Sequence, residues 1–326
     1  NTLLNKPYLM RIGIDIMGGD YAPKATVEGV IAASKAVGKN TTIVLFGDET
    51  QISSILQEND AHLDNIEIVH TSEVIEMGDA PTQAFTKKQD SSIVIGFHYL
   101  KEGKIDGFAS AGSTGAMMVG CMFAIKPIEG VLRPTIMTPL PSFDGRTLYL
   151  LDVGLNLDCK PEVLEQYGLI GSLFAETQGT VNPKIGLLNI GEEEEKGNAV
   201  TKAAHQLMKG ATKYNFVGNI ESKHIFTGDA DVLVCDGFIG NIVLKTAEGL
   251  FPFLIKNEEM RKSPFIKGFN YEIAGGTPVL GINSTVIIGH GCSTPLAIKN
   301  MILQTERCVK AGIVEKIKKA FANEKN

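Results

Sequence analysis

Short runs of apolar, mostly β-branched residues alternate with longer segments of helical periodicity along almost the whole chain. The short runs are apolar without strict alternation, which indicates strands buried on both faces, as in a parallel sheet covered by helices. This pattern predicts strands at 11–15, 42–46, 66–69, 105–110, 148–153, 184–190, 215–217, 232–235 and 285–288. The predicted helices span 24–37, 51–58, 91–102, 114–125, 161–176, 199–209, 239–254 and 295–321. The sequence therefore predicts an α/β fold with a largely parallel sheet.

No internal repeat and no Ser/Gly linker divides the 326 residues, and the 44% apolar content is enough for a large core. We expect one domain over 1–326, in which two α/β subdomains could pack together. The least regular stretch, 133–145, carries three prolines and is interpreted as a crossover between two halves of one sheet. The uncharged run 107–125 is near membrane-spanning length, but its Gly-Ser-Thr-Gly centre favours a buried strand, a turn and a buried helix.

Glycines concentrate at the ends of the predicted strands. They occur in "DIMGGD", "SAGSTGA", "LLDVGLN", "LLNIGEEEEKGN", "VCDGFIGN", "AGGTPVLG" and "GHGCS". The carboxyl ends of parallel strands share one edge of the sheet, where ligands bind in this fold class. Glycine lets a backbone N–H approach a ligand closely, and the helix N-termini that follow favour anions. We therefore expect a small or phosphorylated anion as the ligand.

Composition and missing motifs exclude several functions. A formal charge of −6 and a pI near 5.6 argue against broad nucleic-acid binding. The five cysteines form no CxxC pair, which is typical of a reducing cytoplasm, and the six histidines form no HExxH, so we expect no metal. There is no GxxxxGK[ST], which excludes a P-loop NTPase, and no GxGxxG after the first strand, which weakens a dinucleotide-binding interpretation.

A nucleophile elbow is an alternative for one glycine turn. The stretch "AGSTG" is one residue away from GxSxG and lies between a predicted strand and a predicted helix. A serine nucleophile at Ser113 would need a histidine such as His290 nearby. A helix cap or an anion cradle is the competing interpretation.

The blocks "RIGIDIMGGDYAPKATVEGV", "SAGSTGA", "LLDVGLN", "GLLNIGEEEEKGN", "CDGFIGN" and "HGCS" occur in this order over nearly the whole chain. Together they resemble the acyl-acyl-carrier-protein:phosphate acyltransferases of bacterial phospholipid synthesis. The resemblance implies a three-layer α/β/α sandwich related to isocitrate and isopropylmalate dehydrogenases and to phosphotransacetylases. It also implies transfer of a fatty acyl group from acyl carrier protein to inorganic phosphate, without a cofactor. It further implies a cytoplasmic homodimer with peripheral membrane contact, and a downstream glycerol-3-phosphate acyltransferase that uses the product.

The catalytic pair of that family falls on Lys196 and Asn241. The Lys196 ammonium, which follows four glutamates, would hold phosphate or neutralise the oxyanion, and the Asn241 amide would donate to the carbonyl oxygen or phosphate. From the residues alone, Lys196 could instead be a solvated counter-ion of the acids, and Asn241 could cap a helix. The expected substrate-binding and phosphate-binding residues are Gly18, Gly19, Gly112, Ser113, Thr114, Gly115, Asn156, Asn198, Asp236, Gly240 and His290.

Two acids flank the first glycine turn. Asp15 and Asp20 would repel phosphate, so we expect them to accept backbone hydrogen bonds while Gly18 and Gly19 present N–H groups to the substrate. A divalent metal that bridges an acid and phosphate is the less favoured alternative.

Departures from the family pattern leave some points open. Ser113 stands where relatives more often have asparagine, and Leu155 where alanine is usual. The segment 251–272 is shorter than the helical hairpin of many relatives and is the candidate membrane-facing segment, because it mixes phenylalanines with lysines. Competing functions are a phosphotransacetylase that uses coenzyme A thioesters, a dehydrogenase of the same fold, and a membrane-associated scaffold.

Overall fold

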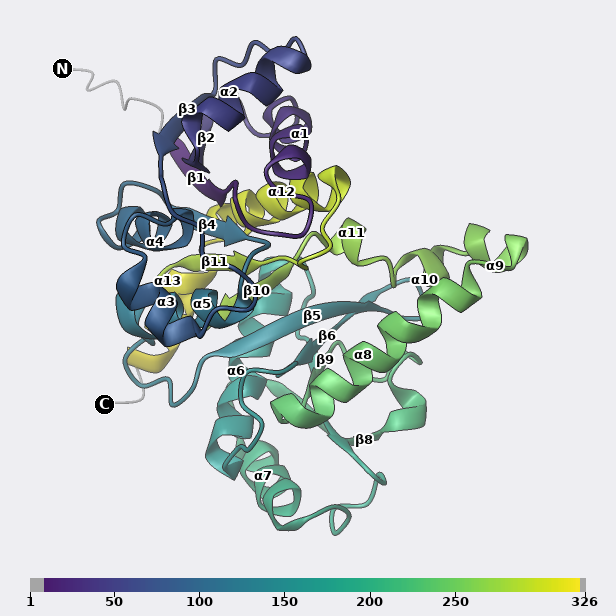
Figure 1. The fold of residues 1–326 in the computed structure, drawn as a ribbon. Helices are drawn as coiled ribbons and strands as arrows, with labels where there is room; N and C mark the ends of the chain where they lie inside the picture. The colour runs from purple at the N-terminus through teal and green to yellow at the C-terminus, as the bar shows by residue number, and fades with distance from the viewer. Residues whose placement is uncertain (1–8, 323–326) are drawn as a thin grey trace, which may run out of the picture. The chain divides into compact units, whose positions relative to one another are not determined.

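The structure, a computed structural model, describes residues 9–322, so the first eight and last four residues of the expected domain 1–326 lie outside it (Figure 1). The chain divides into two compact units, each built from segments distant in sequence. Unit 1 comprises Asn1–Lys126, Glu272–Gly276 and Ile282–Lys310, and unit 2 comprises Pro127–Tyr271, Thr277–Gly281 and Ala311–Asn326.

The sheet of unit 1 is entirely parallel, with strand order β3-β2-β1-β4-β11. Its strands are β1 (Met10–Asp15), β2 (Thr41–Gly47), β3 (Ile66–His70), β4 (Gly107–Ser110) and β11 (Thr285–Ile288). The helices are α1 (Lys24–Ser34), α2 (Glu49–Glu58), α3 (Pro81–Lys87), α4 (Ser92–Lys101), α5 (Thr114–Val119), the π-helical turn η1 (Gly120–Ile125) and α12 (Pro295–Ala311).

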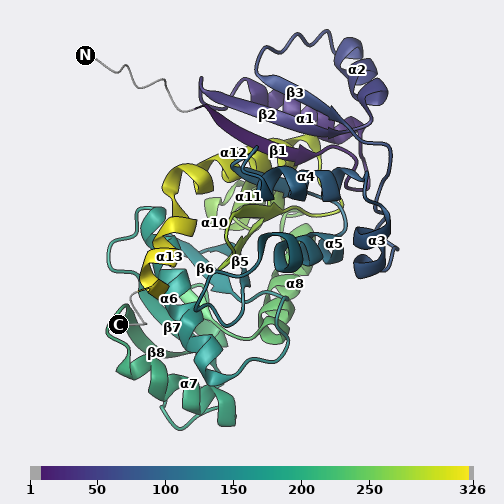
Figure 2. The ribbon, with the colours of Figure 1, turned by 90° about the vertical axis from the view of Figure 1, so that its left-hand side faces the viewer.

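Helices cover both faces of this sheet (Figures 1 and 2). Helix α4 packs on β1, β2 and β4, where the rings of Phe97 and Phe108 meet edge to face with centroids 5.3 Å apart. On the other face, α1 lies so close to α12 that a Cβ on Gly29 would be 2.5 Å from the Ile298 Cβ. Burial on both faces explains why these strands are apolar without alternation.

The sheet of unit 2 has the order β10-β5-β6-β9-β7-β8, and only β5 runs against its neighbours. Its strands are β5 (Thr135–Pro141), β6 (Thr147–Leu151), β7 (Lys184–Asn189), β8 (Asn215–Glu221), β9 (Val232–Val234) and β10 (Thr277–Leu280). The helices are α6 (Pro161–Thr177), α7 (Ala199–Gly210), the 3₁₀ turn η2 (Ser222–His224), α8 (Gly237–Leu254), α9 (Glu258–Lys262), α10 (Pro264–Lys267) and α13 (Ile313–Ala322). The short α11 (Tyr271–Ala274) begins at the last residue of the long unit 2 segment.

Unit 2 is layered in the same way. Helices α6 and α7 pack on each other and on one face of the sheet, whereas α8 lies on the other face (Figures 1 and 2). Close packing depends on Gly171 of α6, where a Cβ would be 2.5 Å from a methyl group of Val232. The prediction of an α/β fold with a mostly parallel sheet is confirmed, and each predicted strand and helix overlaps an observed one.

The segment 133–145 is not an irregular crossover, as the sequence had indicated, because it contains strand β5. The sequence did not predict this strand because the segment contains three prolines. At Pro139 and Pro141 the strand pairs with β6 alone, since β10 pairs only with Thr135 and Ile136. An edge without a second partner tolerates a residue that lacks an N–H donor.

The predicted C-terminal helix 295–321 is two helices, α12 and α13. Gly312 separates them with a φ of +64°, a left-handed conformation that ends α-helices. Strand β10 was missed because it is short and contains Pro278, and its position places Gly275 and Gly276 before a strand rather than after one. The first glycines of "AGGTPVLG" therefore do not form a turn at the carboxyl end of a strand, as the sequence had predicted.

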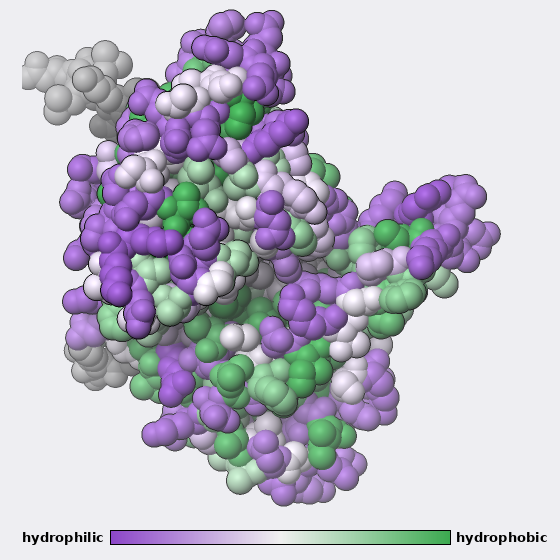
Figure 3. All heavy atoms as spheres, viewed as in Figure 1, coloured by the Kyte–Doolittle hydropathy of each residue, from purple (hydrophilic) through white to green (hydrophobic). Residues whose placement is uncertain are grey.

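The candidate membrane-facing segment folds as the end of α8 followed by α9 and α10. Phe265 and Phe269 pack edge to face with Phe226, and Phe265 also stacks on Phe143 with ring centroids 4.1 Å apart. These contacts attach α10 to unit 2, while Phe253 of α8 remains 68% exposed. Figure 3 shows apolar residues along the exposed face of α8. Within residues 9–322, none of the helices has the length and apolar character needed to cross a bilayer.

Candidate active site

In unit 1, the turns after β1 and β4 are joined through a buried carboxylate. Asp15, which ends β1 and is 1% exposed, accepts hydrogen bonds from the Ser110 hydroxyl at 2.6 Å and from the Met17 backbone nitrogen at 3.0 Å. The Ser110 hydroxyl in turn accepts from the Gly112 nitrogen at 2.9 Å. A Cβ on Gly18 would be 2.6 Å from that same nitrogen, so the two turns pack backbone against backbone.

The turn after β11 joins the same group. The Asp20 backbone nitrogen donates to the Gly291 carbonyl at 2.7 Å, and the Gly289 nitrogen donates to the Ser110 carbonyl at 2.8 Å. His290 lies between these two glycines, and its carbonyl accepts from the Ser293 hydroxyl at 2.6 Å. Three glycine turns of unit 1 therefore meet at the carboxyl edge of its sheet.

A backbone N–H group expected to face a ligand has an acceptor within the protein. The Gly112 N–H donates to Ser110, and the Gly18 backbone lies against the Asp15 carboxylate. Burial raises the pKa of Asp15, although hydrogen bonds from Ser110, Ser92 and the turn amides oppose that effect. The Asp20 carboxylate differs from the expectation, since it accepts no hydrogen bond from the residues that the structure describes; its backbone nitrogen holds the turn instead.

Ser113 is the N-cap of α5. Its hydroxyl, on a side chain that is 4% exposed, accepts from the Ala116 nitrogen at 3.3 Å. Thr114 and Gly115 follow in the first helical turn, where backbone N–H groups lack intrahelical acceptors. A Cβ on Gly115 would overlap the ring of Pro81, which begins α3.

In unit 2, Asp152 repeats the arrangement of Asp15. It is fully buried directly after β6, and its Oδ2 accepts from the backbone nitrogen of Asn156 at 2.6 Å and from the Asn156 amide at 3.0 Å. The backbone nitrogen atoms of Ile136 and Leu155 donate to Oδ1 at 3.1 and 3.3 Å. Burial raises the pKa of Asp152, and these hydrogen bonds oppose the rise.

Helix α8 begins beside this carboxylate. Asp236 caps it by accepting from the Ile239 nitrogen at 2.8 Å, and the Gly237 nitrogen donates to the Asn156 carbonyl at 2.7 Å. A Cβ on Gly240 would overlap the Asp152 carbonyl oxygen, so only glycine allows this approach. Asn241 is therefore not the cap of the helix; it lies within the helix, and its Nδ2 donates to the Val153 carbonyl at 3.3 Å.

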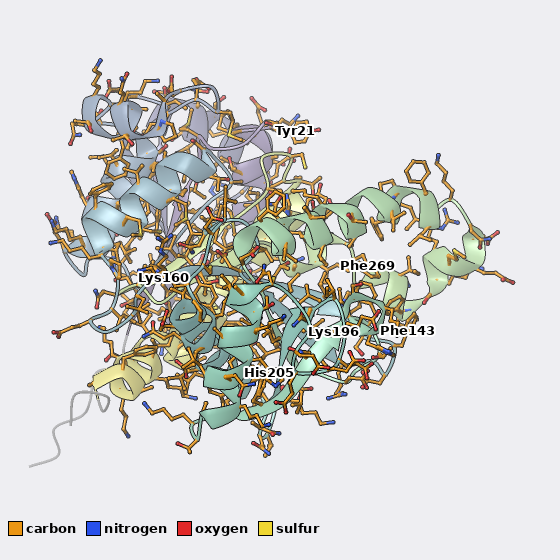
Figure 4. The ribbon with its side chains drawn as sticks, turned by 90° about the horizontal axis from the view of Figure 1, so that it is seen from below. Tyr21, Phe143, Lys160, Lys196, His205 and Phe269 are labelled. Atoms are coloured by element: carbon orange, nitrogen blue, oxygen red, sulfur yellow. The ribbon has the colours of Figure 1, made fainter. Side chains whose placement is uncertain are left out.

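Lys196 lies on the turn after β7 (Figure 4). Its backbone nitrogen donates to the Glu193 carbonyl at 3.1 Å, and its own carbonyl accepts from the Asn189 amide at 3.2 Å. Gly197 follows with a φ of +96°, and Asn198 caps α7 by accepting from the Thr201 nitrogen at 2.9 Å. The turn is thus fixed on both sides of an exposed lysine.

The acids that precede Lys196 have other partners. Glu192 lies 3.4 Å from the His224 ring, and Glu194 pairs with Lys209 at 2.5 Å. Within residues 9–322, no carboxylate lies at ion-pair distance from the Lys196 ammonium. The charge of Lys196 is therefore available to an anionic ligand.

Strands β6, β9 and β7 are neighbours in the sheet of unit 2, so the turns that carry Asn156, Asp236 and Lys196 leave its carboxyl edge side by side. Asn241 follows in the helix that begins there. Sequence reasoning missed Asp152, although "LLDVG" repeats the apolar-strand-then-aspartate pattern of "IGIDIMGG". In the described part of the chain, no cluster of three or more His, Cys, Asp or Glu could hold a metal ion.

Known proteins resemble this chain over nearly its whole length. A family model described as fatty acid synthesis protein matches residues 10–316. The phosphate acyltransferase of Dictyoglomus turgidum is 44% identical over 326 residues, which cover 94% of this chain and 96% of that protein. The phosphate acyltransferase of Desulforamulus reducens is 41% identical, covering 97% and 99%. Among solved structures, a phosphotransacetylase from Streptococcus pyogenes shares the fold with a TM-score of 0.66 at 17% identity, covering 92% and 94% of the two chains.

Proposed function

The chain belongs to the fatty acid synthesis protein family, whose relatives are named phosphate acyltransferase, and we propose that it transfers a fatty acyl group from acyl carrier protein to inorganic phosphate. Acyl transfer to phosphate follows from the family. The carrier protein as donor is the finer part of the proposal. The observation that carries it is the 44% identity to a phosphate acyltransferase over 94% of this chain, together with a family match over residues 10–316, a range that contains Lys196 and Asn241.

The reaction requires little from the side chains. A phosphate oxygen attacks the thioester carbonyl carbon, a C–O bond forms, and the C–S bond then breaks to release acyl phosphate and the carrier thiolate. Phosphate is an anionic nucleophile near neutral pH, so no side chain has to be activated. The protein positions the two substrates, an effect worth up to roughly 7–11 kcal/mol, and stabilises the transient oxyanion.

We assign Lys196 and Asn241 to this chemistry. The Lys196 ammonium, which has no carboxylate partner in the described chain, binds phosphate or the oxyanion. The Asn241 Nδ2 has a second hydrogen beyond the one directed at Val153, and it donates to the same oxygen atoms. Asp152 and Asp236 hold the backbone around them rather than touch the substrate.

The remaining expected residues divide into two roles. The N–H groups of Gly19, Thr114 and Gly115 are the amides we assign to anion binding, because they lie in a glycine turn or in a first helical turn. Gly18, Gly112, Ser113, Asn156, Asn198 and Gly240 shape the turns through the contacts described above. His290 stays a proposed substrate contact.

We further propose a cytoplasmic homodimer that contacts the membrane peripherally and supplies acyl phosphate to a glycerol-3-phosphate acyltransferase. All five cysteines are free, which supports a reducing compartment. Phe238, Ile242 and Leu250 on α8 are 57, 51 and 54% exposed, and this apolar face supports association with a second copy. Sedimentation of the purified protein tests the dimer.

The test of function is phosphate-dependent release of free carrier protein from a long-chain acyl-carrier-protein thioester. Lys196→Ala and Asn241→Ala should each lower turnover by roughly 10²–10³-fold. Lys202→Ala, a change to an exposed lysine in the next helix, is the matched control and should keep wild-type turnover. Wild-type turnover in both active-site variants would overturn the assignment.

A parallel assay with the coenzyme A thioester of the same acyl chain separates this proposal from a phosphotransacetylase. Preference for the carrier-protein thioester supports the proposal, whereas preference for coenzyme A would replace it. Acyl-phosphate formation by the purified protein would also rule out a scaffold as its sole role, and an absorbance change at 340 nm with a nicotinamide cofactor would point to a dehydrogenase.

A further inference from the structure

One carbonyl in the turn before Lys196 accepts two hydrogen bonds. The Glu193 oxygen accepts from the Lys196 backbone nitrogen at 3.1 Å and from the Asn219 amide nitrogen at 2.8 Å. Asn219 lies near the end of β8, the neighbour of β7, and is 5% exposed. Its side chain therefore ties the lysine-bearing turn to the adjacent strand.

A buried histidine fixes the orientation of that amide. The Asn219 Oδ1 lies 3.0 Å from the His205 Nδ1, and an amide oxygen only accepts, so Nδ1 carries the proton of this bond. His205 of α7 is 3% exposed and packs edge to face against Phe216, with ring centroids 5.2 Å apart (Figure 4). Because His205 donates to the oxygen, the nitrogen of Asn219 is directed at Glu193.

The second ring nitrogen of His205 also faces a polar group. Its Nε2 lies 4.0 Å from the Glu194 carboxylate, which pairs with Lys209 at 2.5 Å. Helix α7 is therefore linked to the acidic turn twice, by His205 through the Asn219 side chain of β8 and by Lys209 through its ion pair with Glu194.

A cavity borders the beginning of this turn. A polar cavity of about 520 Å³ is lined by Glu192, Asn219 and His224, among others at the end of β8. Of the residues in the turn, Glu192 lines this cavity, and the backbone of the turn is held by hydrogen bonds. The bonds from Asn219 and Asn189 are the two side-chain bonds to the backbone of Glu193 and Lys196 that the described structure contains.

We propose that Asn219 and His205 are positioning residues that hold the Lys196 ammonium at the reacting phosphate. This inference rests on the proposed catalytic role of Lys196. Neither residue touches the substrate, and both act through the Glu193 carbonyl. Displacement of a catalytic group by about 1 Å can lower turnover on the order of 100-fold, so the loss of this support should be measurable.

The test uses steady-state kinetics with a palmitoyl-acyl-carrier-protein thioester and orthophosphate. Asn219→Asp keeps the size of the side chain and the acceptor for His205 but removes the donor to Glu193. Asn219→Asp should lower kcat/KM by roughly 10–100-fold. The parameter that changes, either kcat or the KM for phosphate, should be the same one that Lys196→Ala changes. His205→Leu should have a similar effect, and His205→Asn, which restores a donor at the Nδ1 position, should recover part of the activity. Asn215→Ala, at the other end of β8, is the matched control and should behave as wild type.

A double-mutant comparison separates positioning from a general structural role. In the Lys196→Ala background, Asn219→Asp should cause no further loss, since the lysine it positions is absent. A full additional loss in that background, or wild-type kinetics of Asn219→Asp beside an impaired Lys196→Ala, would overturn the inference and leave the proposed function intact. Unimpaired Lys196→Ala would instead overturn the catalytic assignment of Lys196 on which the inference rests, while acyl transfer to phosphate would stand.

Discussion

The Asp152 Oδ2 lies 2.6 Å from the backbone nitrogen of Asn156, four residues further along the chain. Asp15 makes the corresponding bond to the backbone nitrogen of Met17 at 3.0 Å. In each unit, an aspartate at the end of a buried strand binds the amides of the turn that follows. A carboxylate accepts several hydrogen bonds at once, so it can fix a glycine turn that has no side chains to pack.

The contact between Gly240 and Asp152 predicts a large effect from adding one methyl group. In Gly240→Ala the new Cβ would overlap the Asp152 carbonyl oxygen, which belongs to the backbone and cannot rotate away. We expect a loss of about 3 kcal/mol or more in the free energy of unfolding, measured by urea denaturation.

Gly249→Ala is the matched control in the same helix. Nothing lies within 4 Å of a Cβ at that position, and alanine favours the helix over glycine by about 1 kcal/mol. We therefore expect Gly249→Ala to stabilise the protein. Equal effects of the two variants would contradict the contact at Gly240.

The buried Asp15 carboxylate predicts a specific pH dependence of stability. Burial raises its folded-state pKa above the unfolded value of 3.8, so its contribution to stability is fully present below that pH and is lost as pH rises through the folded-state pKa. The wild-type free energy of unfolding minus that of Asp15→Asn should therefore fall as pH rises from 3.8 through the folded-state pKa of Asp15. Denaturant unfolding of both proteins across this range measures the difference, and a rise with pH would show that hydrogen bonding outweighs burial.

The sequence was sufficient for the fold class because buried parallel strands are uniformly apolar. The sequence did not reveal two features of the fold, a strand that contains prolines and a break within a long helical pattern. The prolines of β5 are tolerated on an edge that lacks a second neighbour, and the helical pattern across Gly312 continues although its backbone turns left-handed. The prolines depend on strand neighbours that the local sequence does not specify, whereas nothing lies within 4 Å of a Cβ at Gly312, and this glycine ends the helix by its own conformation.

For the candidate site, the sequence predicted where the glycine turns lie, but not which of their backbone N–H groups bond within the protein. Gly112 looked equivalent to Gly19 as an anion donor, yet its N–H group bonds to the Ser110 hydroxyl. Asn219 and His205 were not identified, because nothing in "HQLMKG" or "VGNIE" indicates that the two side chains meet. Such pairings arise only when β7, β8 and α7 are assembled.

The capping role of Ser113 predicts that it is not a nucleophile. The Ser113 hydroxyl accepts a hydrogen bond from the Ala116 N–H, and Ser113 is 4% exposed. Ser113→Ala should therefore lower the free energy of unfolding by about 1 kcal/mol and keep most of the enzymatic activity. Ser113→Asn, which also caps well, should restore the stability. Mass spectrometry of enzyme quenched during turnover should find no acylated serine, and an acyl adduct on Ser113 would establish the alternative mechanism.

The exposed end of α8 predicts how the proposed membrane contact forms. The Phe253 ring is 68% exposed, and the Lys256 ammonium lies 5.1 Å from its centroid, so an apolar ring and a cation face outward together. Burial of a phenylalanine side chain contributes about 2 kcal/mol, so Phe253→Ser should weaken binding to phosphatidylglycerol vesicles roughly tenfold or more in a flotation assay. Phe123→Ser is the matched control, since its ring in unit 1 is 69% exposed but belongs to η1 rather than to the candidate segment. Equal loss in both variants would mean that exposed aromatic rings bind vesicles without regard to position, and the assignment of this segment would fail.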